Sequence, residues 1–469
     1  MKVLLIYPPE KNIVYKVAPA VFSEEAGAYP PLGLVYLATS IRKEGKHEVE
    51  ILDTVVNRME YADIGEYVRS VKPDVVGITF FTFYLRDALA AMKEVRKAHP
   101  PAKIIIGGPH VDVFPGESVK FDEVDAAVYG DGDIVINTVL DNIAAGRPLD
   151  DIPGVITRAN RDRQHVKQLV DDLDSLPLPD RTFLPYNRYE SVLAAGKPIA
   201  TIITSRGCPF NCPYCSGGGV KPRNISPARV AAELEECSRL GIKDFILFDE
   251  LFTLKKKRVF EICDEINRRG LRIRWNVRAR IGTVDREMIQ RMKSAGCRLI
   301  QYGIETGSPR MQKVIGRKHD LGEIEEMIRI TREEGILTYG DFMFGLPGET
   351  PEEMKKTVDF AVKIKLDYAV FGILSVYPRT EYYRQVLEEG RIEEDFWQKF
   401  AEDPSYEVKT TFWPGEHDPK ELEKTVVRAY IRFYFRFRNV IRTLFRKASI
   451  MQKLLLARSA FKVFAKVLK

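Results

Sequence analysis

The first 150 residues alternate short apolar runs with stretches of helical spacing. The apolar runs read as buried strands and lie at residues 3–7, 49–52, 75–80, 103–106 and 126–129. Amphipathic segments, such as residues 34–42 and 85–97, lie between them. Continuous apolar strands that alternate with helices are typical of a parallel sheet covered on both faces. The pattern predicts a flavodoxin-like, doubly wound α/β domain over residues 1–150, with a ligand site at the carboxyl ends of its strands.

The same alternation returns after a proline-rich polar stretch around Leu176-Pro177-Leu178-Pro179, which predicts a linker over residues 151–195. Six further strands are predicted at residues 200–204, 245–248, 272–277, 299–304, 338–344 and 369–374. Amphipathic stretches such as residues 226–240 and 351–365 separate them. Six strand–helix units predict a partial (β/α)6 barrel over residues 196–385, whose chemistry is expected at the carboxyl ends of the strands.

The last part of the chain loses the strand pattern and predicts a helical C-terminal extension over residues 386–469. Its first apolar face recurs at three- and four-residue spacing and consists of Tyr430, Phe433, Tyr434, Phe437, Ile441 and Leu444. A second face, after a break near Ser449, consists of Leu454, Phe461, Phe464 and Leu468. Arginine and lysine side chains flank both faces.

Composition places the chain among ordinary globular proteins. It has 469 residues, of which 45% are hydrophobic and 29% charged, and this balance excludes wholesale disorder. No apolar run approaches the roughly 18 residues of a membrane span, and the N-terminus does not have the pattern of a signal peptide. Six cysteines in so long a chain do not form a disulfide framework, so a cytoplasmic location is expected.

The net charge of +6 is unevenly distributed. Twelve Lys and Arg side chains lie between Arg428 and Lys469, and no Asp or Glu follows Glu423. Without those twelve, the rest of the chain carries six more acidic than basic side chains. Such asymmetry indicates an anionic partner, which can be a membrane surface, a nucleic acid or an acidic patch.

Three interpretations of this basic extension remain open. An apolar face rich in Phe and Leu beside an Arg/Lys-rich face is typical of an interfacial helix, which predicts peripheral contact with the inner face of the cell membrane. The first amphipathic stretch can instead pack on the barrel, and this is compatible with membrane contact by the second. Nucleic-acid binding is not expected, because the aromatic side chains occupy a helical face rather than a stacking platform.

The strongest chemical signal is Cys208-Pro-Phe-Asn-Cys212-Pro-Tyr-Cys215, directly after the first predicted barrel strand. Three thiolates within eight residues can bind one soft metal centre. They can hold a [4Fe–4S] cluster and leave one iron open for a ligand. A structural zinc site normally has four protein ligands, and no fourth Cys or His lies nearby in the sequence, so zinc requires a distant ligand.

This cysteine spacing resembles that of the radical S-adenosylmethionine (SAM) superfamily. The resemblance implies a [4Fe–4S] cluster on Cys208, Cys212 and Cys215 that binds SAM and cleaves it reductively to a 5′-deoxyadenosyl radical. An external electron donor, such as flavodoxin or ferredoxin, is implied as well. Tyr214 is expected to pack over the cluster, with its main chain near the adenine.

Four further segments resemble SAM-binding motifs of that superfamily. They are Phe248-Asp249-Glu250, Trp275-Asn276-Val277-Arg278-Ala279-Arg280, Gly303-Ile304-Glu305-Thr306-Gly307-Ser308 and Phe344-Gly345-Leu346-Pro347-Gly348-Glu349-Thr350. The resemblance implies that Asp249 lies near the SAM amino group, Arg280 near its carboxylate and Glu305 near its ribose hydroxyls. Pro347 belongs to the turn after the fifth strand. Asp249 and Arg280 can equally be partners in structural salt bridges.

A flavodoxin-like domain ahead of such a barrel resembles the cobalamin-binding branch of the superfamily. The resemblance implies a set of cobalamin-binding residues, namely Thr79, Gly107, Gly108, His110, Gly130, Asp131 and Gly132. The glycine turns follow strands four and five, where bare backbone can approach a flat ligand. A domain kept for packing or for nucleotide binding is the alternative, although no GxGxxG or P-loop element is present.

One element of other cobalamin proteins is missing. The loop after the first strand reads Tyr7-Pro8-Pro9-Glu10-Lys11-Asn12 and lacks the DxHxxG motif that supplies an axial histidine. His110 follows strand four and is therefore not expected to be the lower ligand of the cobalt. Water, another side chain or no group at all remain possible in that place.

Together these features predict a cobalamin-dependent radical SAM methyltransferase that acts on an unactivated carbon. The resemblance implies that one SAM supplies the methyl group through cobalamin and that a second supplies the radical. The basic extension favours a lipid or other hydrophobic substrate, and Phe433-Tyr434-Phe435-Arg436 resembles the extension of hopanoid-modifying enzymes of this branch. The alternatives are a cobalamin-dependent cyclase, oxidative or rearrangement enzyme, and a non-catalytic iron–sulfur protein that binds membrane or nucleic acid. No residue is assigned as catalytic.

Overall fold

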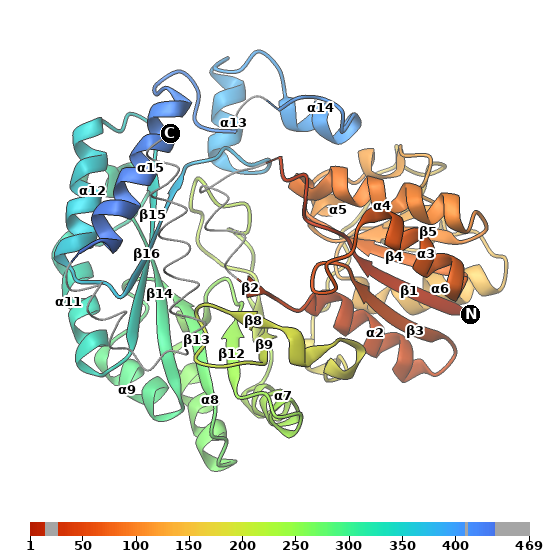
Figure 1. The fold of residues 1–469 in the computed structure, drawn as a ribbon, viewed down its shortest axis with the longest axis horizontal. Helices are drawn as coiled ribbons and strands as arrows, with labels where there is room; N and C mark the ends of the chain where they lie inside the picture. The colour runs from red at the N-terminus through yellow and green to blue at the C-terminus, as the bar shows by residue number, and fades with distance from the viewer. Residues whose placement is uncertain (15–26, 409–410, 437–469) are drawn as a thin grey trace. The chain divides into compact units, whose positions relative to one another are not determined.

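A computed structural model describes residues 1–14, 27–408 and 411–436, which form two compact units (Figure 1). Residues 1–14, 30–188 and 394–408 make up the first, which we call the N-terminal unit. Residues 27–29, 189–393 and 411–436 make up the second, the barrel unit. Each unit therefore contains a segment that lies far away in the sequence from its main part.

The N-terminal unit is built on a six-stranded sheet in the order β3-β1-β4-β5-β6-β7. The strands are β1 Lys2–Tyr7, β3 Glu48–Asp53, β4 Val75–Thr79, β5 Lys103–Gly107, β6 Ala126–Val128 and β7 Val155–Ile156. The first five are parallel, and their order along the sheet is that of a flavodoxin-like doubly wound fold, which confirms the predicted fold class. The two-residue β7 is antiparallel to β6 and was too short to predict.

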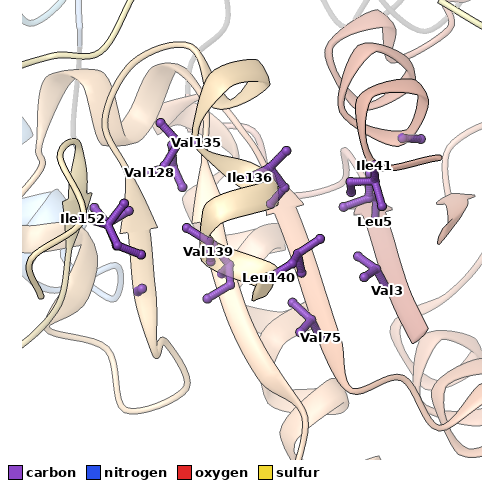
Figure 2. Close-up of a cluster of buried hydrophobic side chains, with 14 of the residues drawn as sticks. Val3, Leu5, Ile41, Val75, Val128, Val135, Ile136, Val139, Leu140 and Ile152 are labelled. Atoms are coloured by element: carbon purple, nitrogen blue, oxygen red, sulfur yellow. The ribbon is translucent and has the colours of Figure 1, made fainter. Parts of the chain in front are cut away.

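Helices cover both faces of this sheet and bury its apolar strands. They are α2 Leu32–Glu44, α3 Tyr61–Val71, α4 Leu85–Ala98, α5 Pro109–Val113 and α6 Ile136–Ala144. Figure 2 shows Val3 and Leu5 of β1 facing Ile41 of α2 and Leu140 of α6, and all four side chains are buried. The apolar runs of the sequence thus form the core because every strand residue faces one helical layer or the other.

A segment of the predicted C-terminal extension also belongs to the N-terminal unit. It contains α14, Phe396–Glu402. Arg86 of α4 donates hydrogen bonds to the carbonyl oxygens of Pro404 and Tyr406, at 2.7 and 2.9 Å. Gln398 donates to Glu117 at 2.8 Å. These contacts join residues about 300 positions apart, which a local sequence pattern does not reveal.

The barrel unit contains six parallel strands in the order β16-β15-β14-β13-β12-β9. They are β9 Ile199–Ile202, β12 Asp244–Leu247, β13 Arg274–Ala279, β14 Cys297–Glu305, β15 Leu337–Phe344 and β16 Tyr368–Ile373. The helices are α7 Pro227–Arg239, α8 Lys256–Arg268, α9 Arg286–Ser294, α10 Pro309–Val314, α11 Leu321–Glu333, α12 Pro351–Lys363, α13 Glu381–Glu388 and α15 Pro419–Tyr434. The end strands β9 and β16 do not pair within the described residues, so the sheet is the partial barrel that was predicted.

The two faces of the barrel sheet differ in character because side chains alternate along each strand. Trp275 of β13 packs among apolar side chains of α7 and α8, and Val277 and Ala279 are buried on the same face. Arg278 lies between them in sequence, is exposed, and therefore points to the opposite face. We call the face away from the helices the inner face.

Helix α15 protects the free edge of β16. The Tyr434 hydroxyl donates to the Ala369 carbonyl at 2.8 Å, and the Tyr430 hydroxyl accepts from the Phe371 amide at 3.3 Å. Both bonds satisfy backbone groups that an edge strand would otherwise expose. The first amphipathic stretch of the basic extension thus packs on the barrel through its aromatic face, up to Tyr434.

None of the helices in the described part of the chain combines the length and apolarity that a membrane span requires. The second amphipathic face predicted for the extension, together with Phe437, Ile441 and Leu444 of the first, lies outside the described residues.

Candidate active site

The three motif cysteines lie in one loop at the carboxyl end of β9. A short antiparallel pair, β10 Ser205–Arg206 and β11 Arg223–Asn224, closes the base of this loop. Inside it, the Val220 amide donates to the Cys208 carbonyl at 2.9 Å, and the Cys215 amide donates to the Cys212 carbonyl at 3.0 Å. The backbone is thus folded back on itself, which holds the three thiols in one region.

Arg280 faces the thiols from the end of β13. Its guanidinium lies 3.4 Å from the Cys212 sulfur and 4.2 Å from the centre of the Phe210 ring. Burial raises the pKa of Cys208 and of Cys215, and the neighbouring thiol groups raise both further. A cation beside such a set of thiols offsets the negative charge that accumulates when they bind iron as thiolates.

The donor set fits an iron–sulfur cluster. Three soft thiols come from one loop, and thiolates are the ligands that iron–sulfur clusters take.

A buried ion pair joins the cysteine loop to β14. Arg317 donates to the hydroxyl of Tyr214 at 2.9 Å and to the Glu305 carboxylate at 2.7 Å. The Arg317 and Glu305 side chains are only 9% and 10% exposed. Arg317 therefore fixes the Glu305 carboxylate beside the ring of Tyr214. Sequence reasoning found Glu305 and Tyr214 but missed Arg317, since no motif marks it.

The backbone at Glu305 is shaped for this arrangement. Glu305 has a φ of 70°, and the pairing of β14 with β15 is irregular between Gly303 and Glu305. A Cβ atom at Gly303 would lie 2.6 Å from a Glu305 carboxylate oxygen. The glycine therefore leaves the space into which the carboxylate folds back, and a left-handed non-glycine residue of this kind is typical of a functional site.

The rest of the GIETGS segment anchors the strand end to α12. The Gly307 amide donates to the Thr357 hydroxyl at 2.9 Å, and the Ser308 hydroxyl donates to Glu353 at 2.8 Å. Arg310 forms an ion pair with Glu353, and its hydrogen bonds lower the pKa of that carboxyl to about 2. These contacts are structural, and they position the end of β14.

The turn after β15 is held by a buried glutamate. One carboxylate oxygen of Glu349 accepts hydrogen bonds from the amides of Gly345 and Leu346, at 2.8 and 3.1 Å. Burial raises the pKa of Glu349 to about 8. Pro347 is half-buried at the tip of this turn. Its contact with SAM remains a prediction.

The acidic pair after β12 divides into a buried and an exposed carboxylate. Asp249 is fully buried and accepts hydrogen bonds from the Thr204 amide at 2.6 Å and the Ser205 hydroxyl at 2.7 Å. These bonds stabilise the root of the cysteine loop. Glu250 is exposed and accepts from the Gly207 amide at 3.2 Å. The contact of Asp249 with SAM therefore stays a prediction, while Glu250 is a second candidate that the sequence did not single out.

In the N-terminal unit, three predicted cobalamin residues meet at the carboxyl ends of β4 and β5. Thr79 pairs in register with Gly107. Gly108 has a φ of 95°, and a Cβ atom there would lie 2.3 Å from the Thr79 hydroxyl oxygen. Only glycine allows the backbone to approach Thr79 this closely. The turn after β5 thus packs closely on the end of β4, at the edge of the sheet where a ligand binds in doubly wound folds.

The second glycine turn contacts another part of the chain. A Cβ atom at Gly130 would lie 2.0 Å from the Gln168 carbonyl oxygen, and the Asp131 amide donates to that oxygen at 2.7 Å. The Asp131 carboxylate accepts from the Val170 amide at 2.9 Å. Gly132 lies next to Leu37 of α2. The structure thus gives Gly130 and Asp131 a role in holding residues 168–170, and their contact with cobalamin stays a prediction.

His110 is completely buried in the N-terminal unit. Its ring stacks on Phe80 with a centroid distance of 5.0 Å, and its Nδ1 atom lies 3.1 Å from the Thr82 hydroxyl. Burial lowers the pKa of His110 to about 3, so the ring is neutral. Its Nε2 atom is buried and has no hydrogen-bond partner among the described residues, and the contact of His110 with cobalamin stays a prediction.

A pocket lies at the point where the strand order reverses, between β1 and β4. Its lining consists of Tyr7, Pro8, Glu10, Thr79, Phe80, Phe81 and Tyr84. Asp87 fixes the loop after β1 by accepting hydrogen bonds from the amides of Lys11 and Asn12, at 3.1 and 2.9 Å. Doubly wound folds bind their ligands at this switch point. The pocket thus lies where a doubly wound fold places its ligand, and the contact of its lining residues with cobalamin stays a prediction.

Two protein-family models match the parts of the chain that contain the cysteine loop and the doubly wound sheet. Residues 202–361 match the model of the radical SAM superfamily, and residues 20–140 match that of the B12 binding domain. The chain is thus a radical SAM enzyme with a cobalamin-binding domain. Its cofactors are a [4Fe–4S] cluster, SAM and cobalamin.

Comparison with individual proteins extends the similarity over nearly the whole chain. An uncharacterized methyltransferase of Pyrococcus horikoshii is 32% identical over 453 residues, which are 95% of each chain. The chain therefore belongs to the family of cobalamin-dependent, methyltransferase-like radical SAM proteins. An anaerobic magnesium-protoporphyrin IX monomethyl ester cyclase of Rubrivivax gelatinosus is 25% identical over 88% of this chain and 75% of its own. The hopanoid C-3 methylase of Methylococcus capsulatus is 25% identical over 72% of this chain and 63% of its own.

Two solved structures share the architecture. The radical SAM methyltransferase TsrM of Kitasatospora setae superposes with a TM-score of 0.68 at 25% identity, over 83% of this chain and 76% of that one. The cobalamin-dependent SAM radical enzyme OxsB superposes with a TM-score of 0.71 over 98% of this chain and 71% of that one. At 16% identity the likeness to OxsB concerns the fold alone.

We expect replacement of any one loop cysteine, for example Cys208→Ala, to abolish stable cluster assembly, because two thiolates do not retain a [4Fe–4S] cluster. After anaerobic reconstitution, the unaltered chain should contain about four iron and four sulfide per chain and the variant close to none. Cys263→Ala is the matched control, since Cys263 is buried in α8 away from the loop. Equal iron content in the Cys208 and Cys263 variants would contradict the assignment.

We expect Gly108→Ala to weaken cobalamin binding. The added methyl group must displace the Thr79 side chain and strains a backbone of positive φ, at a cost of about 1–3 kcal/mol, which corresponds to a loss of affinity of roughly five- to 150-fold. Cobalamin content after purification, measured by absorbance, checks this. Gly116→Ala is the control, because its Cβ atom would meet nothing closer than 3.7 Å. Cobalamin content that is the same in both variants would show that the Gly108 edge does not bind the cofactor.

Proposed function

We propose that this enzyme transfers a methyl group from SAM, by way of cobalamin, to an unactivated carbon of a hydrophobic substrate. The observation that carries the proposal is that one chain contains both a three-thiol loop beside Arg280 and a doubly wound domain that matches the B12 binding model, with a close glycine turn at Thr79 and Gly108. The name of the Pyrococcus horikoshii relative supports methyl transfer, and that of the hopanoid methylase supports a hydrophobic substrate. An external one-electron donor, such as flavodoxin or ferredoxin, completes the system.

The barrel residues prepare SAM for this reaction. When bound, the cluster and SAM supply a carbon-centred radical that removes a hydrogen atom from the substrate. Arg280 provides the positive charge for the SAM carboxylate at the edge of the thiol loop. Arg317 holds one oxygen of Glu305 and leaves the other oxygen to accept hydrogen bonds from the ribose hydroxyls. The rigid Arg317–Glu305 pair thus orients the nucleoside before reaction.

A second candidate is a cobalamin-dependent cyclase without methyl transfer. The 25% identical relative from Rubrivivax gelatinosus that bears this name favours it. The same cofactors serve both reactions, so the distinction depends on the fate of the methyl group.

We expect the reconstituted enzyme to move an isotopically labelled methyl group from SAM into a component of a lipid extract. The measurement is mass spectrometry of the extract after anaerobic incubation with the enzyme, methyl-labelled SAM and a reductant. The product should gain one labelled methyl group, and the Cys208→Ala variant should give no label. A product that forms without label and has lost hydrogen would support the cyclase instead.

We further propose that residues 437–469 bring the enzyme to the inner surface of the cell membrane. This segment contains nine Lys and Arg and no acidic residue. Helix α15, which precedes this segment, packs its aromatic face on β16 and is therefore already occupied. Basic side chains near an anionic leaflet contribute about 1 kcal/mol each.

We expect the full chain to float with anionic liposomes at low salt and a chain ending at residue 436 to remain unbound. Binding should weaken as salt rises, because salt screens the attraction, and it should be weaker on neutral vesicles. Ending the chain after α15 keeps the contacts of Tyr430 and Tyr434 with β16. Equal flotation of the two forms would refute membrane contact by this segment.

A further inference from the structure

The inner face of the barrel carries a polar and aromatic layer. Strand register places Arg278 opposite Gln301, Gln301 opposite Tyr339, and Tyr339 opposite Tyr368. These four residues therefore lie side by side across β13, β14, β15 and β16. The alternate residues of the same strands, among them Val277, are buried under the helices. We call the four residues the inner layer.

The inner layer is unusual for a barrel. Interiors of (β/α) barrels are filled mainly by bulky branched apolar side chains. Here an arginine, an amide and two phenols occupy the equivalent positions, and Arg278 is exposed. Side chains of this kind indicate a face that binds a ligand rather than one that fills a core.

Aromatic rings flank the Arg278 guanidinium. It lies 5.5 Å from the centre of the Phe248 ring, and the Tyr29 ring meets Phe248 at a centroid distance of 5.4 Å. Tyr29 follows β2, Gly27–Ala28, which pairs with β8, Glu190–Ser191. Its hydroxyl lies 2.8 Å from the Ser191 hydroxyl. A residue from the N-terminal part of the sequence thus contributes to the barrel's inner face beside Arg278.

Within the described chain, Arg278 forms no ion pair, whereas its strand neighbour Arg274 pairs with Asp244. The nearby acid Asp341 accepts two hydrogen bonds from the Gln301 amide, at 3.0 and 2.8 Å. Burial, with a contribution from Glu305, raises the pKa of Asp341 to about 7. The positive charge of Arg278 and the Gln301 amide act in the opposite direction and lower the pKa of Asp341. Both Asp341 oxygens already accept from Gln301, and part of the Asp341 population holds a proton at neutral pH, so this carboxyl offsets the charge of Arg278 only in part.

A substrate that covers this face must provide a partner for the positive charge and the N–H groups of the Arg278 guanidinium. Water solvates Arg278 while the face is open, and a bound molecule removes that water. Covering an unpaired charge is costly unless the incoming molecule brings the opposite charge. A carboxylate or phosphate can accept two parallel hydrogen bonds from an arginine, which makes it the matching group.

We propose that Arg278 binds an anionic group, a carboxylate or a phosphate, of the substrate, whose apolar or planar body contacts Tyr29 and Phe248. The inference rests on the proposed function and narrows its substrate class from any hydrophobic molecule to an amphipathic anion. Gln301 binds both oxygens of Asp341, and the cysteine loop follows β9 in the same sheet. Arg278 is thus a specificity-determining residue.

The first test separates an extract by anion exchange and incubates each fraction with methyl-labelled SAM. We expect label in the fraction that the anion exchanger retains. Phosphatase treatment of that fraction should abolish labelling if the group is a phosphate and leave it unchanged if it is a carboxylate. Label found only in the unretained, neutral fraction would overturn the inference and leave methyl transfer established.

Variants then connect the charge to Arg278. Arg278→Gln should lower kcat/KM by about thirtyfold or more, mainly through KM, while iron and cobalamin contents stay unchanged. Arg278→Lys should recover part of the loss because it restores the charge. Arg272→Gln is the matched control, since Arg272 is exposed before β13 begins. Equal KM values in the Arg278→Gln and Arg272→Gln enzymes would contradict the proposal.

A binding measurement separates this inference from the proposed function. The probes are 2-naphthoate and its neutral amide, which share a planar apolar body and differ in charge. We expect the reconstituted enzyme to prefer the carboxylate, and Arg278→Gln to lose that preference while Arg272→Gln keeps it. If no extract fraction is labelled but the enzyme still prefers the carboxylate, the proposed methyl transfer is refuted and the proposed anion binding by Arg278 is supported. If both probes bind equally to the unaltered enzyme, the anion site is refuted whatever the extract shows.

Discussion

The register between parallel strands is the constraint on which both sites depend. In the barrel unit, a single register from β13 to β16 places Arg278, Gln301, Tyr339 and Tyr368 in one layer. Because side chains alternate, the helices receive the apolar residues and the inner face receives the polar ones. The same register brings the end of β13, with Arg280, and the end of β14, with Glu305, to one edge of the sheet. Hydrogen bonds of the backbone thus assemble a site from residues that are distant in sequence.

At two strand ends the backbone leaves the regular strand conformation, and these local changes position residues that strand register alone would not. Glu305 adopts a positive φ at an irregularity of β14, and Gly303 leaves room for its carboxylate. In the N-terminal unit, Gly108 turns the chain sharply after β5, so that its backbone approaches Thr79. Each departure occurs at the carboxyl end of a strand and relies on a neighbouring glycine or on a buried partner. The regular sheet supplies the rigidity that keeps such conformations in place.

Local patterns predicted the strands of both large sheets to within a few residues, except for β7. A buried parallel strand is a short apolar run bounded by helical segments, and this pattern is visible in the sequence without knowledge of the strand's neighbours. The motif cysteines, Arg280 and Glu305 could be named because each stands in a short segment that resembles a known motif. Arg317 has no such motif, and its contact with Glu305 depends on how the chain turns after β14. That Asp249 is buried and Glu250 exposed could not be predicted either, because which of two adjacent acids points inward depends on the turn after β12.

The distribution of charge takes on a more specific meaning once the packing is known. Arg432 of the basic extension pairs with Asp359 of α12, and Arg436 donates to the Val362 carbonyl at 2.9 Å, so part of the positive charge stabilises the barrel. Arg278 offers a positive charge on the inner face of the barrel sheet. A neutral hydrocarbon bound there would leave that charge without a partner. A molecule with an anionic head group and an apolar body is the better match, because its head group can pair with Arg278 and its body can contact the rings of Tyr29 and Phe248.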